Sequence, residues 1–206
     1  MRYWKKKEIP SNINLAISIA CYLTEDPRRK SSLASLLWCL CAQTFPRWQA
    51  VIVHDGPWPE NWSPKDLGIT DPRFIFVSRP RKQQHGHPHR REALLAHTQS
   101  TTHVAFMNDD GWYAPVYFEA MLHTAVVHDA GLVFCDMVHS HKLWQPIQGA
   151  PKHGKIDVGS FIAKRNLVEK TPWNDYGFSG DWSYFEALLK TGAKAIRVPH
   201  VLFVHN

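Results

Sequence analysis

The sequence contains no apolar run long enough to cross a membrane. A transmembrane helix needs about 20 consecutive, mostly apolar residues, and the apolar run near the start, Leu15 to Leu23, is much shorter. This run lacks a persuasive small-residue cleavage site, so we predict a first core strand rather than a signal peptide. A cytoplasmic protein is the default expectation, with Trp4 and Lys5 to Lys7 as candidates for peripheral contact with a membrane surface.

Cysteine is scarce as well. The chain has four cysteines, and no two of them form a Cys-x-x-Cys pair. Cys21 and Cys135 lie in apolar, strand-like runs, which predicts buried free thiols of a reducing compartment. Metal binding by the cysteines is therefore not expected.

Low-complexity segments and internal repeats are also absent. The 206 residues are 44% hydrophobic and 20% charged, which supports a sizeable core and argues against disorder. We expect one domain over residues 1–206. Lys plus Arg is 24 against 18 for Asp plus Glu, a net charge of +6. This balance favours anionic partners such as phosphate groups, nucleic acid or an anionic membrane, although a generally basic surface would also produce it.

Strand-like and helix-like patterns alternate along the chain. Apolar runs typical of strands cover residues 14–20, 48–53, 73–77, 102–107, 131–135, 159–163 and 195–204. Helical spacing covers residues 31–43, 90–100, 115–128 and 183–190, with Ser31 or Ser32 as the first cap. Residues 57–72 and 138–157 are expected to be irregular connections. The alternation predicts a three-layer α/β fold with a mostly parallel sheet.

Polar side chains follow three of the predicted strands. Tyr22 follows the first, Asp55 ends the second, and Asp109-Asp110 follow the fourth. Ligands bind at the carboxyl ends of strands in such sheets, so these residues predict a site there. Adjacent carboxylates repel unless a cation, water or donors compensate them. The pair either binds a hard cation such as Mg²⁺ or Mn²⁺ or forms an acidic turn that caps the helix from Pro115.

Further motifs follow one another between about Leu15 and His205: Ala42-Gln43-Thr44-Phe45-Pro46, Asp55-Gly56, Gly86, Arg91, Asn108-Asp109-Asp110 and Gly180-Asp181-Trp182. Their order resembles that of the family 2 glycosyltransferases. It implies the α/β/α GT-A fold of nucleotide-diphospho-sugar transferases. It also implies a nucleoside diphosphate-sugar donor, with a UDP-sugar as the first expectation, and Mn²⁺ or Mg²⁺ as cofactor.

The resemblance assigns donor-binding roles to three residues. Tyr22 matches a residue that lines the nucleobase pocket, and Asp55 matches an aspartate that accepts a hydrogen bond from the base. Arg91 matches an arginine of the donor-binding segment after Gly86. The other basic side chains of residues 79–91 either surround the diphosphate or remain solvated.

Metal binding and catalysis are assigned in the same way. Asp110 is expected to bind the metal directly, and Asp109 to bind it through water or to hold the ribose. His205 lies where some relatives supply a further metal ligand. Asp181 matches the general base that takes the proton of the acceptor hydroxyl; an N-cap of the helix near Trp182 is the alternative. Inversion of the anomeric centre is implied by the family.

Three positions depart from the family pattern. Many relatives carry Asp at position 108 and Glu at position 180, where this chain has Asn108 and Gly180, and His54 replaces an Asp. A non-catalytic nucleotide- or nucleic-acid-binding module is therefore an alternative, and a transferase acting on a modified base in DNA is another. The acceptor could be a glycan, a lipid-linked sugar or a modified nucleobase, and a homo-oligomer stays open.

Overall fold

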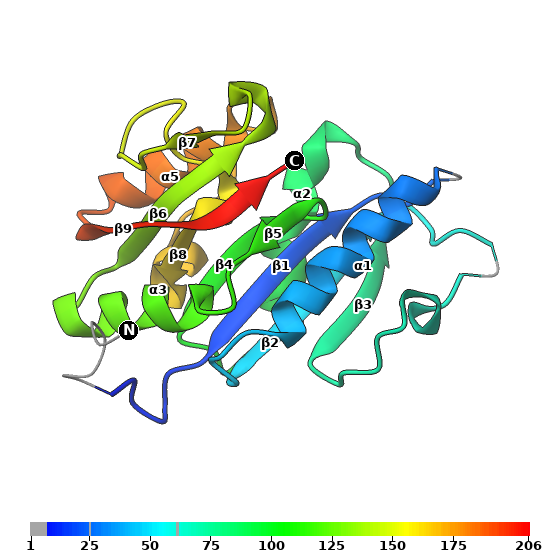
Figure 1. Cartoon of the computed structure of the whole chain (residues 1–206), viewed down its shortest axis with the longest axis horizontal. Coiled ribbons are helices and arrows are strands. Elements are labelled where there is room, and N and C mark those ends of the chain that lie inside the picture. Colours follow the sequence, from blue (N-terminus) through cyan, green and yellow to red (C-terminus); the bar gives the residue numbers. More distant parts are fainter. Residues whose placement is uncertain (1–7, 25, 61) are drawn as a thin grey trace.

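One sheet, covered by helices on both faces, forms the centre of the molecule (Figure 1). The computed structural model describes residues 8–24, 26–60 and 62–206. Trp4 and Lys5 to Lys7, suggested above as membrane contacts, lie outside these residues. Within the described ranges, no helix combines the length and the apolar character needed to cross a bilayer.

The strands of the sheet are arranged in the order β3-β2-β1-β4-β8-β6-β9-β5, with β7 paired to β6. Their bounds are β1 (Leu15–Cys21), β2 (Trp48–Asp55), β3 (Phe74–Arg79), β4 (His103–Asn108), β5 (Gly111–Tyr113), β6 (Leu132–His139), β7 (Gln145–Ile147), β8 (Phe161–Lys164) and β9 (Ala195–His205). Strands β3, β2, β1 and β4 are parallel to one another, and so are β6 and β9. The short β8 joins these two sets and is antiparallel to β4 and β6. The expected mostly parallel sheet is thus confirmed, with short antiparallel strands added to it.

The helices form two layers, one on each face of the sheet. They are α1 (Pro27–Cys41), α2 (His87–His97), α3 (Tyr117–His128), α4 (Arg165–Lys170) and α5 (Gly180–Lys190). Leu15, Ile17 and Ile19 of β1 belong to one apolar cluster with residues of α1 and α3. Ala16, on the opposite face of β1, packs with residues of α2, α4 and α5. This alternation buries both faces and confirms the three-layer α/β/α arrangement.

Three helices begin earlier than the sequence predicted: α1, α2 and α5, the last of which begins at Gly180 rather than at Ser183. α1 begins at Pro27, and its cap is Asp26, whose carboxylate accepts a hydrogen bond from the Arg28 amide. Proline suits the first helical position because its missing N–H has no partner to lose there. The serines suggested as caps therefore lie inside α1. α2 begins at His87 rather than Arg90, directly after Gly86, which has a φ of +74°. His87, Pro88 and His89 are thus part of the helix.

The acidic pair occupies the tight turn between β4 and β5. β5 pairs antiparallel with the end of β9, where Gly111 lies opposite His205. This pairing brings the last strand of the chain to the carboxyl ends of β1 and β4 (Figure 1). The predicted irregular segments also contain β7 and two short 3₁₀ helices, Pro64–Leu67 and Ser140–Lys142.

Candidate active site

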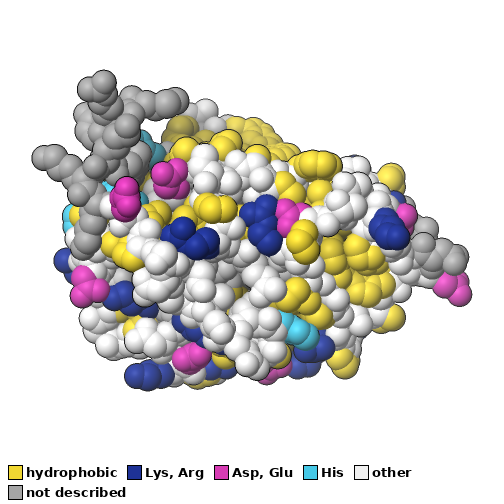
Figure 2. Space-filling model, turned by 90° about the horizontal axis from the view of Figure 1, so that it is seen from below, with side chains coloured by type: hydrophobic (Ala, Val, Ile, Leu, Met, Phe, Trp, Pro, Cys, Tyr) yellow, Lys and Arg dark blue, Asp and Glu magenta, His cyan; other side chains and the backbone are white. Residues whose placement is uncertain are grey.

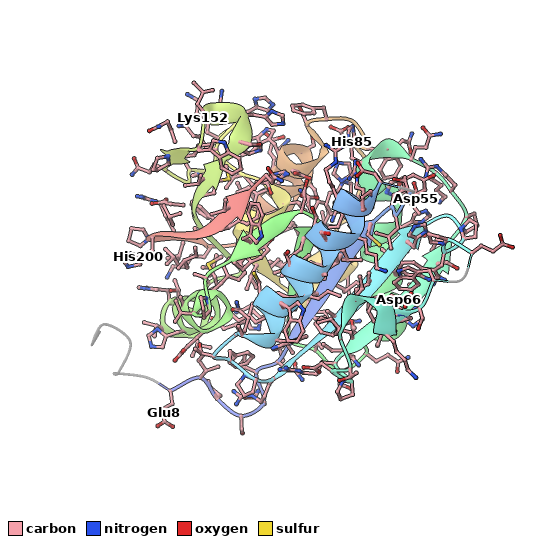
Figure 3. All side chains as sticks on the ribbon, turned by 45° about the vertical axis from the view of Figure 1, so that its right-hand side comes forward. Glu8, Asp55, Asp66, His85, Lys152 and His200 are labelled. Atoms are coloured by element: carbon pink, nitrogen blue, oxygen red, sulfur yellow. The ribbon has the colours of Figure 1, made fainter. Side chains whose placement is uncertain are left out.

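A cavity of ≈ 790 Å³ opens at the carboxyl edge of the sheet. All but one of the predicted site residues line it: Tyr22, Asp55, Asp109, Asp110, Asp181 and His205. They come from the residue after β1, the end of β2, the β4–β5 turn, α5 and β9, which are far apart in sequence. In Figure 3, Asp55 and His85, both in the cavity wall, lie in the upper right of the view, and Glu8 lies at the lower left.

Arg91 is not part of this cavity wall. Its guanidinium donates hydrogen bonds to the carbonyls of Val168 (2.8 Å) and Glu169 (2.6 Å) at the end of α4. The neighbouring Arg90 lines the cavity instead and is 2% exposed. It donates to the Met107 carbonyl and to Oδ1 of Asn108, each at 2.5 Å. Adjacent residues of a helix point about 100° apart, so only one of the two arginines can face the cavity.

Asn108 therefore has a partner that accounts for its departure from the family pattern. Its amide oxygen accepts from the buried Arg90, and its amide nitrogen lies 3.5 Å from Nε2 of His205. His54, a second departure, connects the loops after β1 and β2: its Nε2 accepts from the Leu23 amide and its Nδ1 donates to the Gly56 carbonyl, both at 2.9 Å. Both substitutions fit the local hydrogen bonding.

Tyr22 and Asp55 form one end of the cavity together with the segment that follows β3. The Arg81 guanidinium lies 3.3 Å from the centroid of the Tyr22 ring and covers that face. The Asp55 carboxylate accepts from the amides of Lys82 and Gln83, both at 2.7 Å, and contacts Nε2 of His89 at 3.1 Å. A carboxylate offers about four acceptor positions, so Asp55 retains acceptor capacity for a ligand.

The acidic pair lacks full hydrogen bonding, with Asp109 buried and Asp110 half-buried. Oδ2 of Asp109 and Oδ1 of Asp110 have no hydrogen-bond partner among the described residues. Burial, followed by the charge of Asp110, raises the pKa of Asp109 to about 6, and burial also raises the pKa of Asp110. The residue before α3 is Val116, which makes no side-chain cap. The carboxylates therefore do not cap α3, and they present the oxygen ligands that a hard cation prefers.

His205 connects the acidic pair to a residue that the sequence did not single out. Its Nδ1 lies 2.7 Å from Oδ2 of Asp157, and its Nε2 lies 3.6 Å from Oδ1 of Asp110. Burial lowers the pKa of His205, but the hydrogen bond and charge of Asp157 outweigh it and raise this pKa to about 8. His139, Asp157 and His205 place ligand atoms within 4.8 Å of one another.

Asp181 lies in the second position of α5, and its carboxylate turns away from its own helix. Oδ2 accepts from the Val158 amide at 3.1 Å, whereas Oδ1 has no hydrogen-bond partner in the described chain. Burial and then the charge of Asp157 raise the pKa of Asp181 to about 7. The helix begins at Gly180 with Ser179 in the cap position. The carboxylate therefore does not act as the predicted cap, and it faces the cavity.

Solved structures with a similar fold include one from S. aureus and one from Pyrobaculum calidifontis. S. aureus TarS 1–349 has a TM-score of 0.71 at 13% identity, over 94% of this chain and 60% of that one. Its complex with UDP-GlcNAc has a TM-score of 0.71 at 12% identity, over 94% and 59%. The mannosyltransferase PcManGT from Pyrobaculum calidifontis, in complex with GDP-Man and Mn²⁺, has a TM-score of 0.69 at 17% identity, over 98% and 59%. The chain thus spans about 60% of the length of these structures, and the likeness confirms the GT-A fold.

Sequence comparison identifies the family. No curated protein matches the chain. The model of glycosyl transferase family 2 matches residues 19–190, which include every residue of the cavity named above except His205. The match covers most of the chain, and the chain therefore belongs to glycosyl transferase family 2.

Proposed function

We propose that this chain is an inverting, metal-dependent glycosyltransferase that moves a sugar from a nucleoside diphosphate donor to an acceptor hydroxyl. The observation that carries the proposal is the convergence of Asp55, the Asp109-Asp110 pair and Asp181 on one cavity. Each of the three supplies a different requirement of the reaction: recognition of the base, binding of a cation and removal of a proton.

The acidic turn fits a divalent cation. Asp109 and Asp110 each carry a buried carboxylate oxygen that has no hydrogen-bond partner in the described part of the chain, and Nε2 of His205 faces Asp110. We infer that Asp110, with Asp109 and His205, would hold Mn²⁺ or Mg²⁺, and the PcManGT complex contains Mn²⁺. A cation bound there offsets the negative charge of the leaving diphosphate.

Asp181 is the proposed general base. Its carboxylate lines the cavity, and a pKa of about 7 lets it accept a proton near neutral pH. The acceptor oxygen would bond to the anomeric carbon as its proton moves to Asp181, and the diphosphate would leave from the opposite side. This single displacement inverts the anomeric centre.

The donor end of the cavity is suited to a nucleotide base. Tyr22 offers an aromatic face once Arg81 moves aside, and Asp55 offers a remaining acceptor position for a base N–H. TarS is similar in fold and has been solved with UDP and with UDP-GlcNAc, whereas PcManGT has been solved with GDP-Man. We therefore propose a UDP-sugar first and a GDP-sugar second.

Part of the positive charge of the chain is committed to intramolecular contacts, which leaves fewer basic groups free for a nucleic acid. Several arginines bind carbonyl or carboxylate groups of the protein itself: Arg47, Arg73, Arg90, Arg91, Arg165 and Arg197. On the face drawn in Figure 2, acidic and basic side chains are interspersed. A nucleic-acid-binding protein would need the basic groups gathered and free.

Turnover of a panel of UDP- and GDP-sugars with Mn²⁺ tests the proposal, measured as release of the nucleoside diphosphate with and without added glycan acceptors. Asp181→Asn should lower the rate by about 10²- to 10⁴-fold, because it removes the proton acceptor. Its affinity for the nucleoside diphosphate should stay within about twofold of the wild type. Asp136→Asn, which alters an ion pair with Arg197 outside the cavity, serves as the control. A wild-type rate in Asp181→Asn would contradict the mechanism.

A further inference from the structure

A second titratable side chain faces the proposed base. His87 is 4% exposed at the start of α2, and its Nδ1 lies 3.7 Å from Oδ1 of Asp181. Both atoms are buried, and neither has a hydrogen-bond partner in the described ranges. Leaving a buried polar atom unpaired costs free energy. Two such atoms facing each other become a matched donor and acceptor once one proton is placed between them.

Gly180 makes room for the His87 ring. A Cβ built on Gly180 would lie 3.0 Å from Cδ2 and Nε2 of His87 and 2.6 Å from the Asp175 carbonyl oxygen. A side chain at this position, such as the Glu of many relatives, does not fit beside the ring. The glycine at position 180 therefore leaves the space that the His87 imidazole occupies.

Aromatic packing fixes the orientation of the ring. His87 stacks on Trp173 with centroids 5.0 Å apart and an interplanar angle of 25°. Trp173 in turn stacks on Tyr184 of α5 at 4.2 Å and 6°. Because α5 also carries Asp181, the stack ties the imidazole to the helix that positions the base.

The surroundings keep the imidazole neutral. Burial, followed by the charges of Arg90 and His85, lowers the pKa of His87 to about 3, against the opposing effects of Asp175 and of a hydrogen bond with the Gly177 backbone. A neutral imidazole has one donor and one acceptor nitrogen. Nδ1 has no hydrogen-bond partner among the described residues, so the interaction with the Gly177 backbone is consistent with a proton on Nε2. Nδ1 is left as an acceptor that faces Asp181.

We propose that His87 is a positioning residue for Asp181, whose carboxyl group donates a hydrogen bond to Nδ1 of His87 after it has taken the proton of the acceptor hydroxyl. The inference rests on the proposed role of Asp181. Oδ2 of Asp181 is engaged by the Val158 amide, so the proton goes to Oδ1, the oxygen beside His87.

The step is balanced. The acceptor oxygen forms its bond to the anomeric carbon, and the bond from that carbon to the diphosphate oxygen breaks. Its electron pair leaves on the diphosphate, and the hydroxyl proton ends on Oδ1. Before the step, Oδ1 and Nδ1 both present lone pairs and stand 3.7 Å apart. After it they can form a hydrogen bond, so His87 stabilises the state in which the proton has been transferred and not the starting state.

Other charged groups also act on Asp181. Asp157 raises its pKa further, while Arg90 and His205 lower it. Arg90 is a permanent cation whose two terminal nitrogens donate to Met107, Asn108 and His85, while its Nε has no hydrogen-bond partner among the described residues. His87 differs from these groups because its Nδ1 offers a hydrogen-bond acceptor to Oδ1 of Asp181. A substitution of His87 removes this acceptor and leaves the charged groups in place.

Carbon-13 NMR titration of the aspartate carboxyl groups in the metal-free protein tests the proposal. His87→Leu removes the acceptor but keeps the surroundings apolar, and the pKa of Asp181 should fall by about one unit because the protonated form loses its partner. If burial alone set this pKa, His87→Leu would leave it unchanged or raise it, and that result would overturn the proposal.

Three further variants complete the titration. His87→Asn, whose amide oxygen can take the place of Nδ1, should keep the wild-type pKa; a fall equal to that of His87→Leu would count against an acceptor role. Gly180→Ala should lower the pKa as His87→Leu does, because its Cβ displaces the ring, and it replaces His87→Leu if that variant does not fold. The control is His103→Leu, which removes a similarly buried imidazole at the amino end of β4 and should leave Asp181 unchanged.

Turnover separates this inference from the proposed function. If the protein is a transferase, His87→Leu should lower kcat by about tenfold with an unchanged KM for the donor, and the acid limb of its pH–rate profile should move to lower pH. If neither the wild type nor any variant turned over a donor, the transferase assignment would be contradicted. The expected NMR shifts would still support the pairing of His87 with Asp181. Turnover together with an unshifted Asp181 would overturn the role of His87 alone.

Discussion

Asp157 orients the ring of His205, one of the proposed metal ligands. The Asp157 carboxylate accepts from the Gly159 amide (2.9 Å) and contacts Nδ1 of His205 (2.7 Å). With Nδ1 occupied, Nε2 is the ring nitrogen turned toward Asp110. A carboxylate behind a histidine ligand fixes the ring and its tautomer and strengthens metal binding. Asp157 therefore supports the proposed cation site through His205 and does not form a second metal site.

Asp157→Asn should weaken Mn²⁺ binding by about 10- to 100-fold, because the amide no longer fixes and polarises the His205 ring. Free Mn²⁺ measured by electron paramagnetic resonance during a titration gives the affinity directly. The control is Asp136→Asn, which changes a largely buried carboxylate of β6 and should bind Mn²⁺ as the wild type does. Equal Mn²⁺ affinities in Asp157→Asn and the wild type would show that His205 does not act through Asp157.

Much of the cavity wall could be predicted at the residue scale, because the motifs follow strands whose carboxyl ends meet. Tyr22, Asp55 and the acidic pair were found in this way. Arg90 was missed in favour of Arg91, since the sequence does not show which face of α2 is turned inward before the start of the helix is known. Asp157 and His87 could not be assigned, because their partners lie 48 and 94 residues away along the chain.

At the scale of elements, the connection from β3 to α2 is the most constrained segment of the site. Gln83, Gln84, His85 and Gly86 all have positive φ angles, which cost free energy in residues with a side chain. The Asp55 carboxylate holds the connection through the amides of Lys82 and Gln83. Asp55 therefore fixes the backbone of this connection and is also the proposed contact for the base of the ligand.

Gly86→Ala should destabilise the fold through this connection. The added Cβ would lie 2.5 Å from the Cβ of Ala20 in β1, at a φ of +74°. Gly192→Ala is the matched control, because its φ is +82° but nothing lies within 4 Å of its Cβ. We expect denaturant unfolding to give a loss of about 1 kcal/mol for Gly192→Ala and about 2 kcal/mol or more for Gly86→Ala. Equal losses would mean that β1 and the connection can separate at little cost.

Short elements were the ones that sequence patterns could not predict. β5 and β7 have three residues each, too few to show a period of two. β5 nevertheless matters, because its pairing with β9 brings His205 to the acidic turn. The long strands and helices were predicted well, since their apolar residues repeat over several turns or pleats.

At the scale of the whole molecule, the fold explains why residues from distant parts of the chain form one site. The parallel strands end at one edge, and the C-terminal strand returns to that edge through β5. The chain belongs to glycosyl transferase family 2 and spans about 60% of the length of the similar solved structures. We expect this edge to bind a nucleoside diphosphate together with a metal.

Calorimetric titration with UDP, GDP, CDP and dTDP, each with and without Mn²⁺, tests that claim most directly. We predict that one nucleotide, UDP first, binds at least tenfold more tightly with Mn²⁺, and that Asp110→Asn abolishes this gain while Asp136→Asn keeps it. Metal-dependent nucleotide binding at this edge would be contradicted if a folded sample bound none of the four nucleotides, or bound one equally well with and without the metal.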